Sequence, residues 1–335
     1  MPAELPAGLI LRAYEDGDER AILGLFNRYF PHSPRTREHF RWKYQSDPFG
    51  KEHISLAFAG AQLAGHYAGY PVPFTLFDER AKRHELLAHQ IGDTMTDASV
   101  RHIGKGPSSV LGRTALHFYE HFCEGRVAFN YGFNVDNIQK FSLRFLRSDR
   151  VEHVTYRVAP VPPPIARAER WLRGYSFQLV RDTNAEFDEF FDRVAGAYRF
   201  CVTRNAAYLR WRYLERPDVP YNLIVVRKWR RMVGWIVFRI IDERFSWGDA
   251  LFDPEFPDAV EVALRHVVPS QPVKSIEAWF PPRPRWFDSA LVALGFETRP
   301  QPQDLSLMCV PFTLGRATDR MREDLYYTWG DSDLF

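Results

Sequence analysis

The stretch "HFRWKYQSDPF", residues 39–49, decides the fold because it recurs as "YLRWRYLERPD" at residues 208–218. Residue 208 lies 169 positions after residue 39, and at this offset an arginine, a tryptophan, a tyrosine and a proline coincide in the two copies. Similarity at a fixed offset indicates a duplicated architecture. We therefore expect one domain design to occur twice, with the Arg-Trp motif in an architectural role.

The segments around the motif correspond as well. Residues 18–30 and 187–200 both place apolar side chains at helical spacing, and Gly65 and Gly234 are related by the same offset. Each copy has the pattern of a strand, two helices, an antiparallel set of three strands, a helix, a strand and a helix. This order predicts an α/β (α+β) fold of two tandem domains, each with a mixed, mostly antiparallel sheet flanked by helices.

The domain boundaries follow from the repeat and from one proline-rich segment, "PVPPPIARAER", which is typical of a stiff linker. We place the first domain at 1–155, the linker at 156–172, the second domain at 173–313 and a tail at 314–335. The tail ends in "YYTWGDSDLF", which is aromatic and acidic. We expect it to dock on the body of the protein, in the cleft between the two copies.

Composition narrows the class of protein. The 335 residues are 45% hydrophobic and carry a net charge of +2, which is ordinary for a globular protein and does not call for nucleic acid or a membrane as partner. Three widely separated cysteines have no zinc-site spacing and predict reduced thiols in a cytoplasmic protein. We expect no signal peptide and no membrane span, because residues 1–20 lack the required pattern and no apolar run is long enough.

A glycine-containing stretch, "VRHIGKGPSS" at residues 100–109, lies between a predicted strand and the helix that follows it. Glycine lets the backbone approach a ligand closely, and the N–H groups of a helix's first turn favour an anion. Arg101 and Lys105 add positive charge, and Ser108 adds a hydroxyl group. The stretch therefore predicts a phosphate-binding loop in the first copy, whereas residues 250–262 of the second copy contain no glycine.

This loop and its surroundings resemble the GNAT acyltransferase superfamily, whose Arg/Gln-x-x-Gly-x-Gly/Ala loop binds the pyrophosphate of acyl-CoA. The stretch "GDTMTDASVRHIGKG" (92–106) is similar to the family's fourth strand and loop, and "NYGFNVDNIQKFSLRFL" (130–146) to its fifth strand and next helix. The resemblance implies acetyl-CoA or another acyl-CoA as co-substrate, without a metal. It implies CoA contacts at Met95, Thr96, Arg101, His102, Gly104, Lys105, Gly106, Ser108 and Asn137.

Acyl transfer needs a base for the acceptor, donors for the oxyanion and a proton for the leaving thiolate. Asp93 and His89 are the candidate bases, since an even spacing places them on one face of a regular strand. Tyr131, near the end of the fifth strand, is the candidate acid. In the tail, Asp333, Asp331 or the α-carboxylate of Phe335 would reach the acceptor if the tail does more than pack.

Three functional hypotheses remain open. The first is a GNAT-type acyltransferase acting on a small-molecule amine such as an amino sugar, as a monomer or homodimer. The second is a Fem-like transferase that uses aminoacyl-tRNA, although the second copy shows no long helical-hairpin insertion. The third is a non-catalytic binding protein, which His102, Ile103 and the Arg144 that replaces the family's frequent tyrosine favour.

Overall fold

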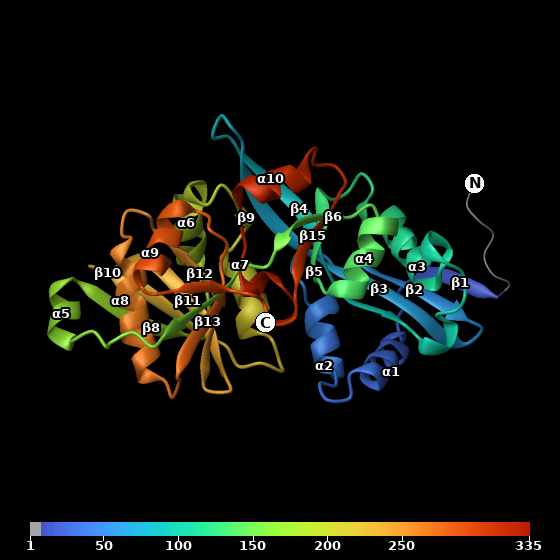
Figure 1. Ribbon diagram of the computed structural model, residues 1–335, viewed down its shortest axis with the longest axis horizontal. Helices are drawn as coiled ribbons and strands as arrows, with labels where there is room; N and C mark the ends of the chain where they lie inside the picture. The colour runs from blue at the N-terminus through green and yellow to red at the C-terminus, as the bar shows by residue number, and fades with distance from the viewer. Residues whose placement is uncertain (1–7) are drawn as a thin grey trace. The chain divides into compact units, whose positions relative to one another are not determined.

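The computed structural model describes residues 8–335, apart from the side chain of Asp136, and divides into two compact units (Figure 1). The first unit contains residues up to 73, 86–153 and 305–319, and the second contains 74–85, 154–304 and 320–335. Residues 1–7, with which the first predicted domain begins, lie outside the described residues.

The first unit follows the predicted order of strands and helices. Its elements are β1 (Leu9–Ala13), α1 (Glu19–Tyr29), α2 (Arg37–Phe40), η1 (Arg41–Gln45), β2 (Ile54–Ala59), β3 (Gln62–Phe77), β4 (Arg83–Thr96), η2 (Ala98–Val100), η3 (Gly106–Ser108), α3 (Val110–Phe118), η4 (Tyr119–Cys123), β5 (Phe129–Asn134), α4 (Asp136–Phe145), β6 (Asp149–His153) and β15 (Ser306–Pro311). The far ends of β3 and β4 belong to the second unit, and α10 (Ala317–Asp324) spans the boundary between the units.

The strands of this unit lie in the order β1-β2-β3-β4-β5-β15-β6. All pairs with a described register are antiparallel except β4 with β5, which run parallel. A mixed and mostly antiparallel sheet was predicted, and the structure confirms it.

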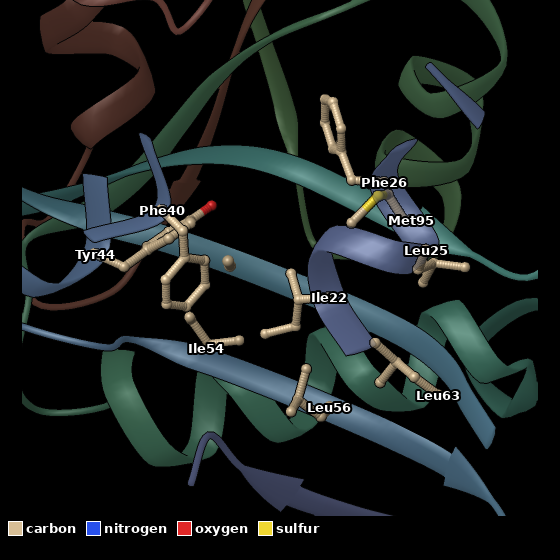
Figure 2. Packing of buried hydrophobic residues seen from close by; sticks show 10 residues of the cluster. Ile22, Leu25, Phe26, Phe40, Tyr44, Ile54, Leu56, Leu63 and Met95 are labelled. Atoms are coloured by element: carbon tan, nitrogen blue, oxygen red, sulfur yellow. The ribbon is translucent and has the colours of Figure 1, made fainter. Parts of the chain in front are cut away.

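Helices cover both faces of this sheet. On one face α1 turns Ile22, Leu25 and Phe26 toward β2, β3 and β4, because an i, i+3, i+4 spacing forms one side of a helix. Figure 2 shows these side chains with Phe40 and Met95 in a single cluster. The opposite face packs against α3 and η4 through a second cluster of buried residues. The sheet is therefore buried on both sides, and its ligand-accessible parts are strand ends and loops.

The second unit repeats the design. Its elements are β7 (Tyr156–Pro160), α5 (Arg167–Leu172), β8 (Tyr175–Val180), α6 (Ala185–Val194), η5 (Ala195–Ala197), β9 (Phe200–Val202), α7 (Ala206–Leu209), η6 (Arg210–Leu214), β10 (Asn222–Lys228), β11 (Arg231–Ile241), β12 (Arg244–Phe252), α8 (Asp258–Val267), η7 (Val268–Ser270), β13 (Ser275–Trp279), α9 (Arg285–Ala293), β14 (Glu297–Arg299), β16 (Leu325–Tyr326) and η8 (Trp329–Asp331). Its sheet has the order β14-β7-β13-β12-β11-β10-β8, and β12 and β13 are its parallel pair.

The observed domain boundaries differ from the predicted ones and correct them. The segment expected as a linker, 156–172, begins with β7, which pairs with β13, and ends in α5, so it belongs to the second unit. In turn β15, expected within the second domain at 173–313, pairs with β5 and β6 of the first unit. Each sheet is completed by a strand from the other half of the sequence. The helical and strand patterns are local, whereas these strand pairings join distant segments.

The repeated Arg-Trp motif forms a short helical turn in both units. In η1 and η6 the backbone N–H after the turn bonds the carbonyl oxygen five residues back, the hydrogen bond of a π-helix. Trp42 and Trp211 are 7% and 1% exposed, so both belong to the core. None of the helices in residues 8–335 has both the length and the apolar character that a membrane crossing requires.

Candidate functional site

Strand β4 departs from regular geometry at Asp93, whose φ of +52° lies in the left-handed region. Such an irregularity changes the alternation of side chains along a strand. Asp93 therefore faces Lys43 and Tyr44 on the α2 side of the sheet, while His89 contacts Phe118 on the α3 side. The prediction that His89 and Asp93 share one face was wrong for this reason.

Asp93 is held by an ion pair inside the first unit. Lys43 Nζ donates to its Oδ2 at 2.7 Å, and the hydroxyl group of Tyr44 donates to the same oxygen at 2.9 Å. Burial raises the pKa of Asp93, but the ammonium of Lys43 and the guanidinium of Arg35 outweigh it and hold that pKa well below its usual range. The carboxylate is therefore ionised, and it is a weak proton acceptor.

A small pocket lies beside this carboxylate, and its cavity volume of about 10 Å³ leaves room for about one water molecule. Its lining comes from α1, α2, η1, β4 and the segment between α1 and α2, and is mostly apolar: Ile22, Leu23, Phe26, Arg35, His39, Phe40, Tyr44, Asp93 and Met95. Oδ1 of Asp93 makes no hydrogen bond with any described residue. The pocket is thus nearly filled by its own side chains, and one carboxylate oxygen in its wall is left able to accept a hydrogen bond.

Next to the pocket, strands β4 and β5 diverge. Their parallel register covers only Ala88–Gln90 with Phe129–Tyr131, although β4 continues to Thr96 and β5 to Asn134. Beyond Gln90 the edge of β4 that faces β5 is left without a partner strand in the described register. At the point of separation the buried side-chain amide of Gln90 has neither its oxygen nor its nitrogen bonded within the described residues.

The predicted glycine loop follows β4 and the short turn η2 in the chain. Gly104 and Gly106 have φ of +71° and +54°, and the backbone N–H groups from 104 to 106 donate to no acceptor within residues 8–335. A Cβ on Gly104 would lie 2.1 Å from the carbonyl oxygen of Ser108, so this position requires glycine. Helix α3 begins just after the loop and is capped by Ser109, whose hydroxyl oxygen accepts from the N–H of Gly112 at 3.1 Å.

The charged residues of the loop are at the surface. Arg101, His102 and Lys105 are exposed, and the guanidinium of Arg101 lies over the ring of Tyr29 and donates to the carbonyl oxygen of Thr96 at 3.2 Å. The structure thus gathers Met95, Thr96 and the loop residues expected to contact CoA at one end of β4. Asn137 lies apart from the loop: it is exposed near the start of α4, whereas the loop meets Phe145 near the end of that helix.

His89 is a structural residue. It is fully buried, its Nε2 lies 2.7 Å from Nδ1 of His53, and its Nδ1 lies 3.1 Å from the Oδ1 of Asn130. Burial, together with the neighbouring ring of His53, lowers the pKa of His89 to about 3. With both ring nitrogens engaged and no exposed surface, His89 is not placed to take a proton from an acceptor.

The other two predicted catalytic residues lie in different surroundings. Tyr131 is 3% exposed in β5 between β4 and β15, with its ring beside Phe129 and Phe133. Asp333 is half-buried in the last part of the tail, residues 320–335, which belongs to the second unit.

The last part of the tail, residues 320–335, packs within the second unit. The ring of Phe335 lies over Gly248 of β12, where an added Cβ would be 1.8 Å from it, and Trp329 stacks on Trp279 of β13. Tyr326 donates a hydrogen bond of 2.8 Å to the carbonyl oxygen of Ala250. The tail therefore covers the ends of β12 and β13, the parallel pair that corresponds to β4 and β5 of the first unit.

The hydrogen-bond partners of the motif tyrosines were not predicted from the sequence. Tyr213 donates to Asp249 of β12 at 2.7 Å, as Tyr44 does to Asp93 of β4. The basic residue between tryptophan and tyrosine differs in its role: Lys43 pairs with Asp93, whereas Arg212 donates to the carbonyl oxygen of Ser332 in the tail. The basic residue that both motifs carry at this position, Lys43 and Arg212, was the feature of the sequence that could have indicated these partners.

No group of three or more His, Cys, Asp or Glu side chains in the described part of the chain is arranged to hold a metal ion. The pocket, the unpaired edge of β4 and the glycine loop together form the candidate site, which lies within the first unit.

The fold is that of known acyltransferase structures. A conserved protein of Enterococcus faecalis, titled a probable N-acyltransferase, superposes with a TM-score of 0.66 at 13% identity over 91% of this chain and 73% of its own. A GCN5-related N-acetyltransferase of Anabaena variabilis gives 0.62 at 11% identity, covering 90% and 72%. The N-myristoyltransferase of Saccharomyces cerevisiae with bound myristoyl-CoA gives 0.57 at 11% identity, covering 92% and 84%.

These neighbours confirm a GNAT-type fold in which two similar sheets are flanked by helices. No protein-family model and no curated protein matches the sequence.

Proposed function

We propose that the chain is an acyltransferase that uses acetyl-CoA or another short acyl-CoA, bound to the first unit, to acylate an amine. One observation carries the proposal. The edge of β4 that β5 leaves unpaired after Gln90 leads directly into a glycine loop whose N–H groups from 104 to 106 have no acceptor in the described residues. The GNAT-type fold of the neighbours supports it.

An acyl-CoA matches this arrangement in shape and charge. Its pantetheine arm, which carries amide groups, would lie along residues 91–96 as an added strand does. Its pyrophosphate would meet the N–H groups of the loop, with the positive charges of Arg101 and Lys105 nearby. The second unit offers no such place, because its tail covers the ends of β12 and β13.

In the transfer step the amine nitrogen attacks the thioester carbonyl carbon, the C–N bond forms and the C–S bond breaks. Asp93 is too weakly basic to remove the proton efficiently, since its pKa lies well below the usual range. We assign it a different role: its Oδ1 accepts a hydrogen bond from the amine and stabilises the positive charge that develops on nitrogen. The proton then passes to water, and the leaving thiolate takes one from water.

The pocket restricts the groups that react. Because it has room for about one water molecule, a substrate group enters only if lining side chains move, which favours acetyl or another short acyl group. The apolar lining favours an amine carried on a partly apolar group. An amino sugar, which the family resemblance implies, would place hydroxyl groups against Phe26, Phe40 and Met95. We therefore rank small apolar amines ahead of amino sugars as acceptors.

The test is the release of free thiol from acetyl-CoA in the presence of a panel of amines and amino sugars. We expect amine-dependent release with wild-type protein, and release lowered about a hundredfold in Asp93→Asn. The same reactions with longer acyl-CoAs test whether the pocket limits the length of the acyl group. Reactions with aminoacyl-tRNA as the donor test the Fem-like alternative. Tight acetyl-CoA binding without release for any amine would support a binding protein and contradict the proposal.

A further inference from the structure

The second unit contains a larger pocket that the proposed reaction does not use. Its cavity volume is about 470 Å³. Pockets for small molecules and cofactors typically measure roughly 300–1,000 Å³. Its lining comes from the turn after η5, the loop between β13 and α9, and the end of α10: Ala197, Tyr198, Arg199, Pro282, Arg283, Pro284, Arg285, Arg322, Glu323 and Asp324.

The lining carries an excess of positive charge, with four arginines against Glu323 and Asp324. Arg199 pairs with Asp324 at 3.1 Å, so one acidic group is neutralised within the pocket. Arg283 donates through Nε to the carbonyl oxygen of Leu325 at 3.0 Å, which fixes its guanidinium at the wall. Arg285 is exposed and makes no hydrogen bond or ion pair within the described residues.

The backbone that carries Arg283 and Arg285 is restricted in its conformation. Pro282 and Pro284 flank Arg283, and each proline fixes its own φ. Arg285 is the first residue of α9, and the N–H groups of Arg285 and Trp286 have no acceptor among residues 8–335. Backbone donors at a helix start add to the attraction that the side chains exert on an anion.

The position in the fold also favours a ligand. The pocket lies beyond the carboxyl end of β13, which runs parallel to β12. In mostly parallel α/β sheets, ligands bind outside the carboxyl ends of the strands. The second sheet is mainly antiparallel, and β12 and β13 are the pair with a described register that offers such an edge. The tail covers the neighbouring ends of β12 and β13 but leaves this pocket open beside residues 322–324.

We propose that this pocket binds an organic phosphate, of the size of a nucleoside diphosphate. Guanidinium groups match phosphate oxygens in charge and in paired hydrogen-bond geometry. Several arginines around one space favour a ligand with more than one negative charge over a single carboxylate. The inference does not depend on the acyl-transfer proposal, because the pocket and the glycine loop belong to different units.

Calorimetric titration of the full chain with inorganic pyrophosphate, ADP and adenosine tests the proposal. We expect pyrophosphate and ADP to bind and adenosine not to bind. Arg285→Glu should weaken the binding of both phosphates at least tenfold, because it replaces an unpaired cation with an anion at the pocket. Arg181→Glu is the matched control: Arg181 is also exposed in the second unit, has no partner within the described residues and does not line the pocket.

Coenzyme A also carries phosphates, so the glycine loop must be distinguished from the pocket. In Gly104→Glu, binding of pyrophosphate and ADP should stay within twofold of wild type. The proposal is overturned if the wild type shows no binding at millimolar probe, or if Arg285→Glu and Arg181→Glu bind equally. Loss of binding in Gly104→Glu but not in Arg285→Glu would also overturn it, since the phosphate would then occupy the loop.

Discussion

Lys43 Nζ lies 2.7 Å from the Oδ2 of Asp93, and the lysine side chain is 3% exposed. The pair joins the repeated motif to the irregular position of β4, at the wall of the pocket where we place the reacting amine.

Substitutions at this ion pair should affect stability and activity separately. Asp93→Asn removes the negative charge that Asp93 places beside the buried ammonium of Lys43, which should lower the free energy of unfolding by up to about 3–5 kcal/mol. Adding Lys43→Met removes the ammonium and should restore much of the loss. Acyl transfer should stay about a hundredfold low in both variants. Denaturant unfolding and initial rates measure the two effects, and recovery of the rate in the double variant would argue against a role for Asp93 in the reaction.

His89 should affect stability without affecting the pH dependence of the reaction. Replacing it in His89→Gln disturbs buried hydrogen bonds to His53 and Asn130, at a cost of about 1–3 kcal/mol. The rate profile between about pH 5.5 and 9 should keep its shape, because the pKa of His89, at about 3, lies below that window. A profile that loses its acid limb in the variant would restore His89 as a candidate base.

Asp47 is predicted to destabilise the protein at neutral pH. It is 1% exposed, its Oδ2 has no partner within the described residues, and burial raises its pKa to about 8. An unfolded aspartate has a pKa of about 3.9, so between these values only the folded state holds the proton and its stability falls as pH rises. Asp47→Asn should raise Tm at pH 7.5, with a gain that vanishes near pH 4.

Parallel melting curves of wild type and Asp47→Asn across that range provide the measurement. A gain in Tm that is equal at pH 4 and pH 7.5 would show that charge is not the cause.

The contact between Gly248 and Phe335 predicts a coupled pair of variants. Gly248→Ala places a methyl group where the ring lies, so it should displace the end of the tail. Phe335→Ala removes the ring and should cost about 3–5 kcal/mol on its own. In the double variant the methyl group no longer meets the ring, so the two costs should be less than additive. Unfolding and limited proteolysis of the tail measure this, and strict additivity would contradict the contact.

Much of the fold follows from local sequence patterns. Helix α1 was expected at 18–30 and occurs at Glu19–Tyr29, because apolar spacing and a polar opposite face are local properties. The Arg-Trp repeat predicted two copies of one design, which the two units confirm. The exchange of β7 and β15 between the sheets was not predictable, since strand partners far apart in sequence leave no local signal.

The candidate site was predictable only in part. The glycine loop carries its own signal, because positive φ at Gly104 and Gly106 requires a residue without a side chain. Asp93 was predicted as a site residue, but its hydrogen-bond partners and the face of the sheet on which it lies were not predicted. One residue in the left-handed region shifts the alternation of side chains along the strand. Whether these residues bind CoA and react stays a prediction.

The most direct test of the account is acetyl-CoA binding by Gly104→Glu, read as a thermal shift and by calorimetry. Gly125→Glu is the matched control: it has the same charge and also a positive φ, but nothing lies within 4 Å of its added Cβ. We predict that wild type and Gly125→Glu gain Tm with acetyl-CoA, and that Gly104→Glu does not, while all three melt cooperatively without ligand. An equal gain in Gly104→Glu, or no gain in wild type, would contradict the assignment of the glycine loop as the acyl-CoA site.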